Sequence, residues 1–137
     1  MKEVFVLDAC ALVALLMKEK GWDIVADIYQ QANNGNVLLY MNRINLLEVY
    51  YGFYRDRGKE YASNIITSVE ESSVLINEFD SSIFQEAGRL KAMYKISLAD
   101  SIVVAQTIIL NGSIITSDHH ELRFIEGKEN LHFTWIR

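Results

Sequence analysis

The chain has 137 residues, of which 50% are hydrophobic, and a formal net charge of −5. This composition excludes an intrinsically disordered protein, and it supplies enough apolar residues for one domain spanning residues 1–137 with a buried core. The acidic balance argues against a protein that holds nucleic acid through a broad basic surface, and the lone cysteine fits a reducing, cytoplasmic setting.

The first predicted element is a strand over Val4–Leu7, followed by Asp8 and a helix from Ala9 to about Lys18. Its apolar residues are continuous rather than alternating, which is typical of a strand covered on both faces. Asp8 interrupts the apolar run of residues 4–17, and no A-x-A cleavage site follows, so we expect neither a signal peptide nor a membrane span. On local grounds alone, Asp8 is a helix cap more often than a ligand.

A second helix is predicted from Trp22 to about Asn33, a second strand over Val37–Met41, and a third helix from Asn42 to about Arg55. In this third helix Glu48 is the only charge within a long apolar and aromatic stretch. Burying an unpaired carboxylate is costly, so Glu48 needs a cation, a proton or an exit to water. The alternative is that Glu48 faces solvent or pairs with a nearby arginine.

The remaining elements alternate in the same way. We predict a helix over residues 59–71, a strand over 74–76, a helix over 81–94, a short helix from Asp118 to about Ile125, and an edge strand over 133–136.

The most informative stretch is Lys95–Leu122. Ser97 followed by Asp100 has the form of a capping box and begins a helix that is apolar on all sides to Leu110, which predicts burial on all sides. Asn111-Gly112 closes this helix, residues 113–116 form a strand, and Asp118 follows its end.

Together these elements predict a three-layer α/β/α sandwich with a mostly parallel central sheet of four to five strands. Residues beyond the carboxyl ends of parallel strands line one crevice, which is where Asp8 and Asp118 fall. Asp100, in the first turn of its helix, and Glu48, two turns into another, can converge on the same edge.

Four clustered carboxylates repel one another, and oxygen-only ligation suits Mg²⁺ or Mn²⁺. Such a cation generates a hydroxide nucleophile from water and stabilises the leaving oxygen in phosphodiester cleavage. The sequence therefore predicts a metal-dependent hydrolase.

Four segments of the chain, VFVLDACALVALL, INLLEVYYG, SLADSIVVAQ and IITSDHHEL, resemble the PIN-domain family, and within it the VapC-like toxin ribonucleases of toxin–antitoxin pairs. The resemblance covers nearly the whole chain and implies that Asp8, Glu48, Asp100 and Asp118 form the catalytic quartet that holds Mg²⁺ or Mn²⁺. Ser117 would be a nearby polar helper. Ala9 and Ala11 depart from relatives that carry a hydroxyl beside the first aspartate.

The resemblance also implies an RNA substrate and a cognate antitoxin, and the apolar residues named next predict a homodimer as well as the antitoxin contact. The residues Val49, Tyr50, Phe53 and Tyr54 broaden the apolar face of the Glu48 helix beyond what one core absorbs, which predicts a partner interface. The competing interpretation is a PIN-like interaction module without catalysis, although binding alone has no use for four clustered charges.

Two other fold-level alternatives fit less well. A receiver-type signalling domain needs an acidic pair after the first strand, where this chain has Asp8-Ala9, and a dehalogenase-type phosphatase needs a second aspartate where Cys10 stands.

Several further side chains have two interpretations each. Cys10 is either a reactive thiol at a helix start or a small core residue, and the second is favoured. His119 and His120 could bind metal or phosphate, or begin an exposed helix. Two basic groups, residues 55–59 and 89–95, could contact an RNA backbone or be solvated helix ends.

Overall fold

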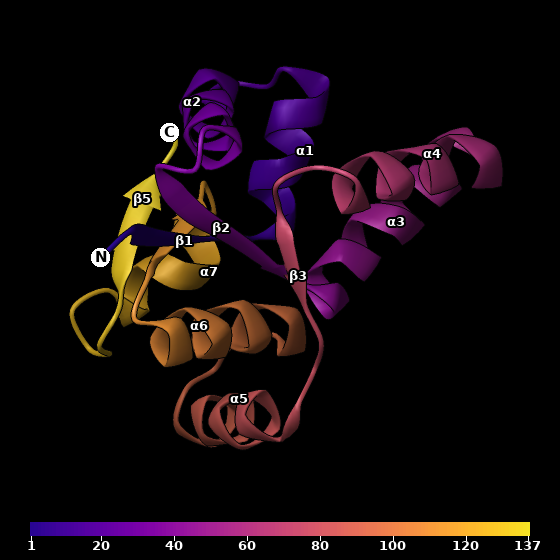
Figure 1. Cartoon of the computed structure of the whole chain (residues 1–137). Helices are drawn as coiled ribbons and strands as arrows, with labels where there is room; N and C mark the ends of the chain where they lie inside the picture. Colours follow the sequence, from indigo (N-terminus) through magenta and orange to yellow (C-terminus); the bar gives the residue numbers. More distant parts are fainter.

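The computed structural model describes residues 1–137 and has the predicted three-layer α/β/α architecture (Figure 1). Its elements are β1 (Glu3–Leu7), α1 (Ala9–Met17), α2 (Trp22–Asn33), β2 (Val37–Asn42), α3 (Arg43–Arg57), α4 (Lys59–Glu70), β3 (Leu75–Asn77), α5 (Ser81–Met93), α6 (Leu98–Leu110), β4 (Ser113–Thr116), α7 (His119–Leu122), a 3-10 turn (Arg123–Ile125) and β5 (His132–Trp135). Their bounds lie close to those predicted from the sequence.

All five strands are parallel, in the order β3-β2-β1-β4-β5, so the predicted position of the last strand at a sheet edge is confirmed. Helices α1 and α2 cover one face of the sheet, and α5 and α6 cover the other (Figure 1). Helices α3 and α4 pack together as a pair that extends away from the sheet. None of the helices combines the length and hydropathy needed to cross a bilayer.

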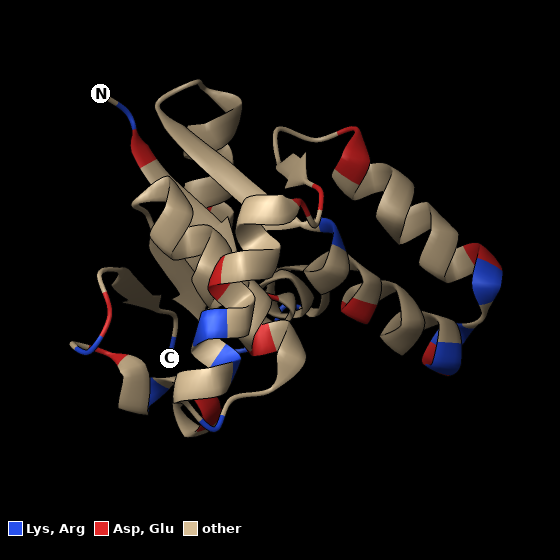
Figure 2. Cartoon of the chain, turned by 90° about the horizontal axis from the view of Figure 1, so that it is seen from below, with Lys and Arg blue, Asp and Glu red and all other residues tan.

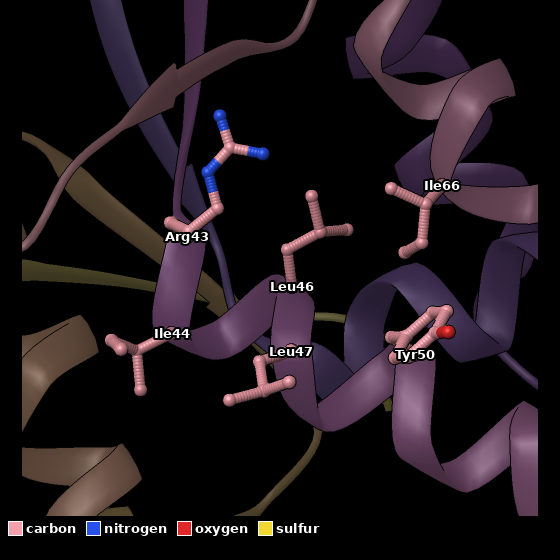
Figure 3. A pocket seen from close by; sticks show the side chains of 6 residues that line it. All are labelled: Arg43, Ile44, Leu46, Leu47, Tyr50 and Ile66. Carbon is pink, nitrogen blue, oxygen red and sulfur yellow. The ribbon is translucent and has the colours of Figure 1, made fainter. Parts of the chain in front are cut away.

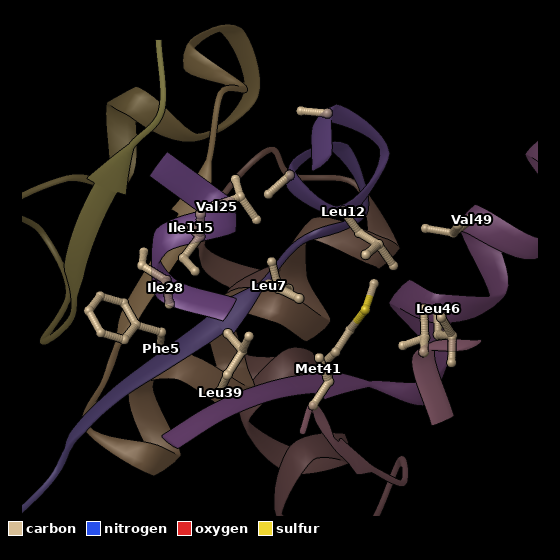
Figure 4. Close-up of a cluster of buried hydrophobic side chains, with 14 of the residues drawn as sticks. Phe5, Leu7, Leu12, Val25, Ile28, Leu39, Met41, Leu46, Val49 and Ile115 are labelled. Carbon is tan, nitrogen blue, oxygen red and sulfur yellow. The ribbon is translucent and has the colours of Figure 1, made fainter. Parts of the chain in front are cut away.

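Two apolar clusters fill the space on the two faces of the sheet. In β1, Phe5 and Leu7 point into the cluster beneath α1 and α2 (Figure 4), whereas Val6 between them belongs to the cluster beneath α5 and α6. Successive side chains of a strand face opposite ways, so only an unbroken apolar strand can satisfy both clusters.

The α6–β4 unit has the predicted termini. The Ser97 hydroxyl accepts a hydrogen bond from the Asp100 amide at 3.2 Å, and Asn111 ends the helix with a φ of 53°. Gly112 follows because a Cβ there would lie 2.9 Å from the Val4 carbonyl oxygen. The middle of α6 is buried, but Leu98 and Ile109 near its ends are exposed, so burial on all sides holds only for the central turns.

Candidate active site

The carboxyl edge of the sheet brings the four predicted carboxylates to one place. A pocket of about 130 Å³ is lined by Asp8, Ala9, Cys10, Asn45, Glu48, Asp100 and Asp118. The acids come from four different segments, namely the end of β1, the middle of α3, the first turn of α6 and the end of β4. The convergence of the four carboxylates therefore depends on the whole fold. Their burial and hydrogen-bond partners differ from one acid to the next.

Asp8 combines the two roles that the sequence left open. Its side chain caps α1 by accepting a hydrogen bond from the Ala11 amide at 2.8 Å, and it also lines the pocket while only 5% exposed. Burial raises the pKa of Asp8 to about 6, against the hydrogen bonds that stabilise the ionised form. The charge of Asp118 raises this pKa further, as the smallest of the causes.

The sulfhydryl of Cys10 and the hydroxyl of Thr116 support the two aspartates. The Cys10 Sγ donates to Asp8 Oδ1 at 3.1 Å, and the Thr116 Oγ1 accepts from the Asp118 amide at 3.0 Å while its side chain also hydrogen bonds Asp8. Burial, followed by the charge of Asp8, raises the pKa of Cys10 to about 12, so this thiol is not an activated nucleophile. These two side chains provide the hydrogen bonds that Ala9 and Ala11 cannot provide.

Asp100 and Glu48 occupy the other side of the pocket. Burial raises the pKa of Asp100 to about 6, and the charges of Asp118, Asp8 and Glu121 act in the same direction. The half-buried Glu48 has a pKa raised by burial and lowered by a hydrogen bond from Asn45. The alternative, in which Glu48 pairs with a nearby arginine, is not observed, because Arg43 binds Glu70 and Glu78 and Arg55 lies over the ring of Tyr51.

Asp118 is held by the short α7. Its side chain accepts from the Glu121 amide at 3.2 Å, so it too is a helix cap that faces the pocket. Ser117, the predicted polar helper, does not line the pocket but lies 3.3 Å from the Cys10 sulfur.

The histidines next to Asp118 lie outside the pocket. The His119 ring stacks on Trp135 with centroids 4.0 Å apart, and its Nε2 lies 2.6 Å from the Arg137 carbonyl oxygen. The His120 side chain is 93% exposed. His119 therefore fastens the carboxyl-terminal strand, and neither ring lines the acidic pocket.

The two groups of basic residues that could contact an RNA backbone differ in their contacts within the protein. Arg89 is bound to Glu86 at 2.7 Å and to Glu129 at 2.6 Å, and Lys91 donates to the Ile96 carbonyl oxygen, so these two side chains are structural. Arg55 and Arg57 lie at the free end of the α3–α4 pair, over the rings of Tyr51 and Tyr61. In the view of Figure 2 the Lys and Arg positions are interspersed with Asp and Glu positions.

The chemistry of the pocket fits a hard divalent cation. No three His, Cys, Asp or Glu side chains are already close enough to enclose an ion. Mg²⁺, however, takes one or two protein carboxylates directly and keeps several waters, so a closed cage is not required. The pocket also contains the Asn45 Oδ1, a buried acceptor without a hydrogen-bond partner. A cation bound here would stabilise the ionised carboxylates, whose pKa values burial has raised, and would give the unpartnered oxygen a partner.

Asn45 is the site residue that sequence reasoning missed. It precedes Glu48 by three positions on the same helix, so the i, i+3 spacing could have found it once Glu48 was a candidate.

Part of the predicted partner interface is wrong. Val49 and Phe53 are 2% and 6% exposed and belong to the core cluster, because α1 and α4 pack against that side of α3. Tyr50 is half-buried and Tyr54 is 46% exposed, so these two rings remain accessible.

A family model described as PIN domain matches residues 5–126. Among solved structures, the chain is similar to DNA-bound VapBC from Salmonella typhimurium (12% identity, TM-score 0.76, all of both chains covered) and to VapBC-1 from nontypeable Haemophilus influenzae (22% identity, TM-score 0.70, 97% of this chain and 98% of that chain). It is also similar to VapC20 from Mycobacterium tuberculosis, a toxin that cleaves the sarcin–ricin loop (11% identity, TM-score 0.64, 80% of this chain and 86% of that chain). At these identities the likeness is one of fold. A comparison with curated protein sequences gave no match.

Proposed function

This chain belongs to the PIN-domain family, as its motifs indicated, and we propose that it is a divalent-metal-dependent endoribonuclease and the toxin of a toxin–antitoxin pair. The observation that carries the proposal is the convergence of Asp8, Glu48, Asp100 and Asp118 on one pocket at the carboxyl edge of the sheet. The structural relatives are VapBC toxin–antitoxin complexes and, in one case, a toxin that cleaves RNA, which supports the choice within the family.

The four carboxylates would hold Mg²⁺ or Mn²⁺, which when bound activates water and stabilises the leaving oxygen of a phosphodiester. Asp8 is the fixed member of the set, since the Ala11 amide and the Cys10 thiol orient its oxygens. Glu48, Asp100 and Asp118 are partly exposed and can rotate toward a ligand. Protons are held at Asp8 and Asp100 below pH 6 and would leave when a cation binds.

The first test is direct. We expect the purified protein to cleave RNA at a single-stranded or loop position, where unstacked bases are accessible, in Mg²⁺ or Mn²⁺ but not in EDTA. Because the protein is acidic, we expect cleavage of few sites rather than general degradation. Cleavage is read on a panel of structured RNAs by primer extension. A panel left intact in both cations would favour the interaction module instead.

An apolar groove along α3, the helix that carries Glu48, supports an antitoxin partner. The groove has a volume of about 250 Å³ (Figure 3) and is lined by Arg43, Ile44, Leu46, Leu47, Tyr50 and Ile66. Helix α3 contributes Leu47 and Tyr50 to this groove and Glu48 to the acidic pocket. We propose that an apolar antitoxin segment lies along α3 and that an arginine or lysine from it pairs with Glu48 or Asp118.

A homodimer is the second proposed assembly, and the protein would act in the cytoplasm. Its candidate surface is a different apolar patch, formed by the exposed side chains of Phe79, Phe84 and Leu98 on and beside α5 and α6.

One pair of substitutions separates the two surfaces. Leu47→Glu places a charge in the groove at a position that is already 49% exposed, so the fold should survive while capture of the co-expressed antitoxin is lost. Phe84→Glu, at a position 65% exposed, should leave that capture intact and reduce the molar mass measured by light scattering. If Leu47→Glu captures the antitoxin as well as the wild type does, the groove is not part of the antitoxin interface.

A further inference from the structure

The Asn45 side chain is a buried amide with one unused oxygen. It is 1% exposed, and its Nδ2 donates to the Ala99 carbonyl oxygen at 3.1 Å. Its Oδ1 has no hydrogen-bond partner although it is buried, and the residue lines the acidic pocket. Nearly all buried polar atoms in folded proteins have a partner, so this oxygen needs an explanation.

The orientation of the amide is fixed by its neighbours. Exchanging the oxygen and nitrogen would place Oδ1 against the Ala99 carbonyl oxygen, and two acceptors cannot share a hydrogen bond. The nitrogen also hydrogen bonds Glu48, so both of its hydrogens have acceptors. The oxygen is therefore the atom left without a partner.

The second buried atom without a partner shows why Asn45 is different. Gln106 Nε2 is a donor, and Gln106 does not line the acidic pocket. A donor cannot bind a cation, whereas an amide oxygen is a ligand that Mg²⁺ and Mn²⁺ accept. Only Asn45 combines an unpartnered acceptor with a position among the four carboxylates.

Charge also favours a neutral oxygen at this point of the pocket. The four carboxylates already exceed the charge of one divalent cation, and burial penalises the ionised forms of Asp8, Glu48 and Asp100. An amide oxygen adds a ligand without adding repulsion. Asn45 is linked to two of the acids, since Glu48 lies one turn further along α3 and Ala99 precedes Asp100 in α6.

We propose that Asn45 Oδ1 is a neutral oxygen ligand of the divalent cation in this pocket, beside the carboxylates. The inference rests on the proposed function only for the presence of the cation. Asn45 thereby also positions Glu48 against Asp100, because its amide nitrogen joins α3 to the first turn of α6.

The test compares the binding of Mn²⁺ by three variants, measured by titration calorimetry without RNA. Asn45→Ala removes the oxygen and should weaken Mn²⁺ binding by about tenfold or more, a loss that even outer ligand partners produce. Asn45→Asp keeps an oxygen at the same place and should bind Mn²⁺ at least as tightly as the wild type. Asn42→Ala is the matched control, because Asn42 is a fully buried asparagine of the same region that bonds Gln106 at 2.8 Å and lies outside the pocket.

Melting in EDTA separates ligation from a purely structural role. All three variants lose a buried hydrogen bond and should melt below the wild type, but only Asn45→Ala should lose the stabilisation that added Mn²⁺ gives. Wild-type affinity in Asn45→Ala would overturn the proposal. If Asn45→Ala does not fold, Asn45→Leu, which keeps the side-chain volume but has no oxygen, takes its place in both measurements.

The outcome is independent of the nuclease assay. A wild-type protein that binds Mn²⁺ but leaves RNA intact would contradict the proposed function and leave the ligand assignment standing if Asn45→Ala binds more weakly. An active nuclease whose Asn45→Ala variant binds Mn²⁺ as the wild type does would contradict the ligand assignment alone. A wild type that binds no Mn²⁺ would contradict both.

Discussion

Replacing Asp118 by asparagine is expected to raise the melting temperature of the metal-free protein and to abolish its activity. The charge of Asp118 disfavours the ionised forms of Asp8 and Asp100, so removing it should stabilise the apo protein at pH 7 by about 1 kcal/mol. The cap on α7 should survive, because asparagine can accept from the Glu121 amide as aspartate does. Cleavage in Mg²⁺ should fall by at least about a hundredfold, since even outer partners of metal ligands contribute about 10- to 100-fold.

The matched control for this variant is Asp80→Asn. Asp80 is also an aspartate cap, accepting from the Ile83 amide at 3.0 Å at the start of α5, but it lies outside the pocket. Cleavage by Asp80→Asn should therefore equal that of the wild type. Melting is followed in EDTA and cleavage in Mg²⁺ for both variants. An Asp118→Asn protein that melts unchanged and still cleaves RNA would remove Asp118 from the site.

The size of this stabilisation is modest because repulsion is not the main cause of the raised pKa values. The sequence predicted mutual repulsion among four carboxylates, whereas in the structure burial is the largest cause of the raised pKa values of Asp8, Glu48 and Asp100. Burial depends on which helices cover the edge of the sheet, and the order of elements alone does not give that.

The features that the sequence predicted well are those that depend on the order of elements and not on how the helices pack. Unbroken apolar strands such as Val4–Leu7 require cover on both faces, and parallel strands place Asp8 and Asp118 at one edge whatever the side-chain details. The sequence indicated only that Glu48 and Asp100 can converge on this edge, because their distances from it depend on helix placement, and the family resemblance then implied that they do.

The errors concern packing between helices. The run from Val49 to Tyr54 is apolar nearly all round, so its pattern cannot show which side α4 covers; the structure buries Val49 and Phe53 and leaves Tyr54 exposed. Asn45 was missed for a related reason. Its spacing from Glu48 indicates only that both residues share one side of α3, and its importance depends on the absence of any partner for one atom.

The largest stability effect is expected from Asp8→Asn, and it depends on pH. The pKa of Asp8 is raised from 3.8 to about 6 in the fold, so between these values the folded protein binds more protons than the unfolded chain, and stability falls as pH rises. At about 1.36 kcal/mol per pKa unit, ionised Asp8 costs the metal-free protein about 3 kcal/mol above pH 6. Asparagine retains the cap on α1 and carries no charge, so Asp8→Asn should match the wild type near pH 3.5 and exceed it by up to about 3 kcal/mol at pH 7.

Urea unfolding in EDTA across this pH range measures the difference, and Asp80→Asn again provides the control with the opposite sign. The Ile83 amide holds the pKa of Asp80 below its usual value, so Asp80 stabilises the fold at neutral pH and loses that contribution as the pH falls. Asp80→Asn should thus be the less stable protein at pH 7 and approach the wild type in acid. Millimolar Mg²⁺ should reverse the ranking of Asp8→Asn, because the cation stabilises the ionised carboxylate that the variant lacks. If Asp8→Asn instead follows the wild type at every pH, Asp8 is not held as a buried, uncompensated carboxylate, and the argument for a cation at this pocket loses its main support.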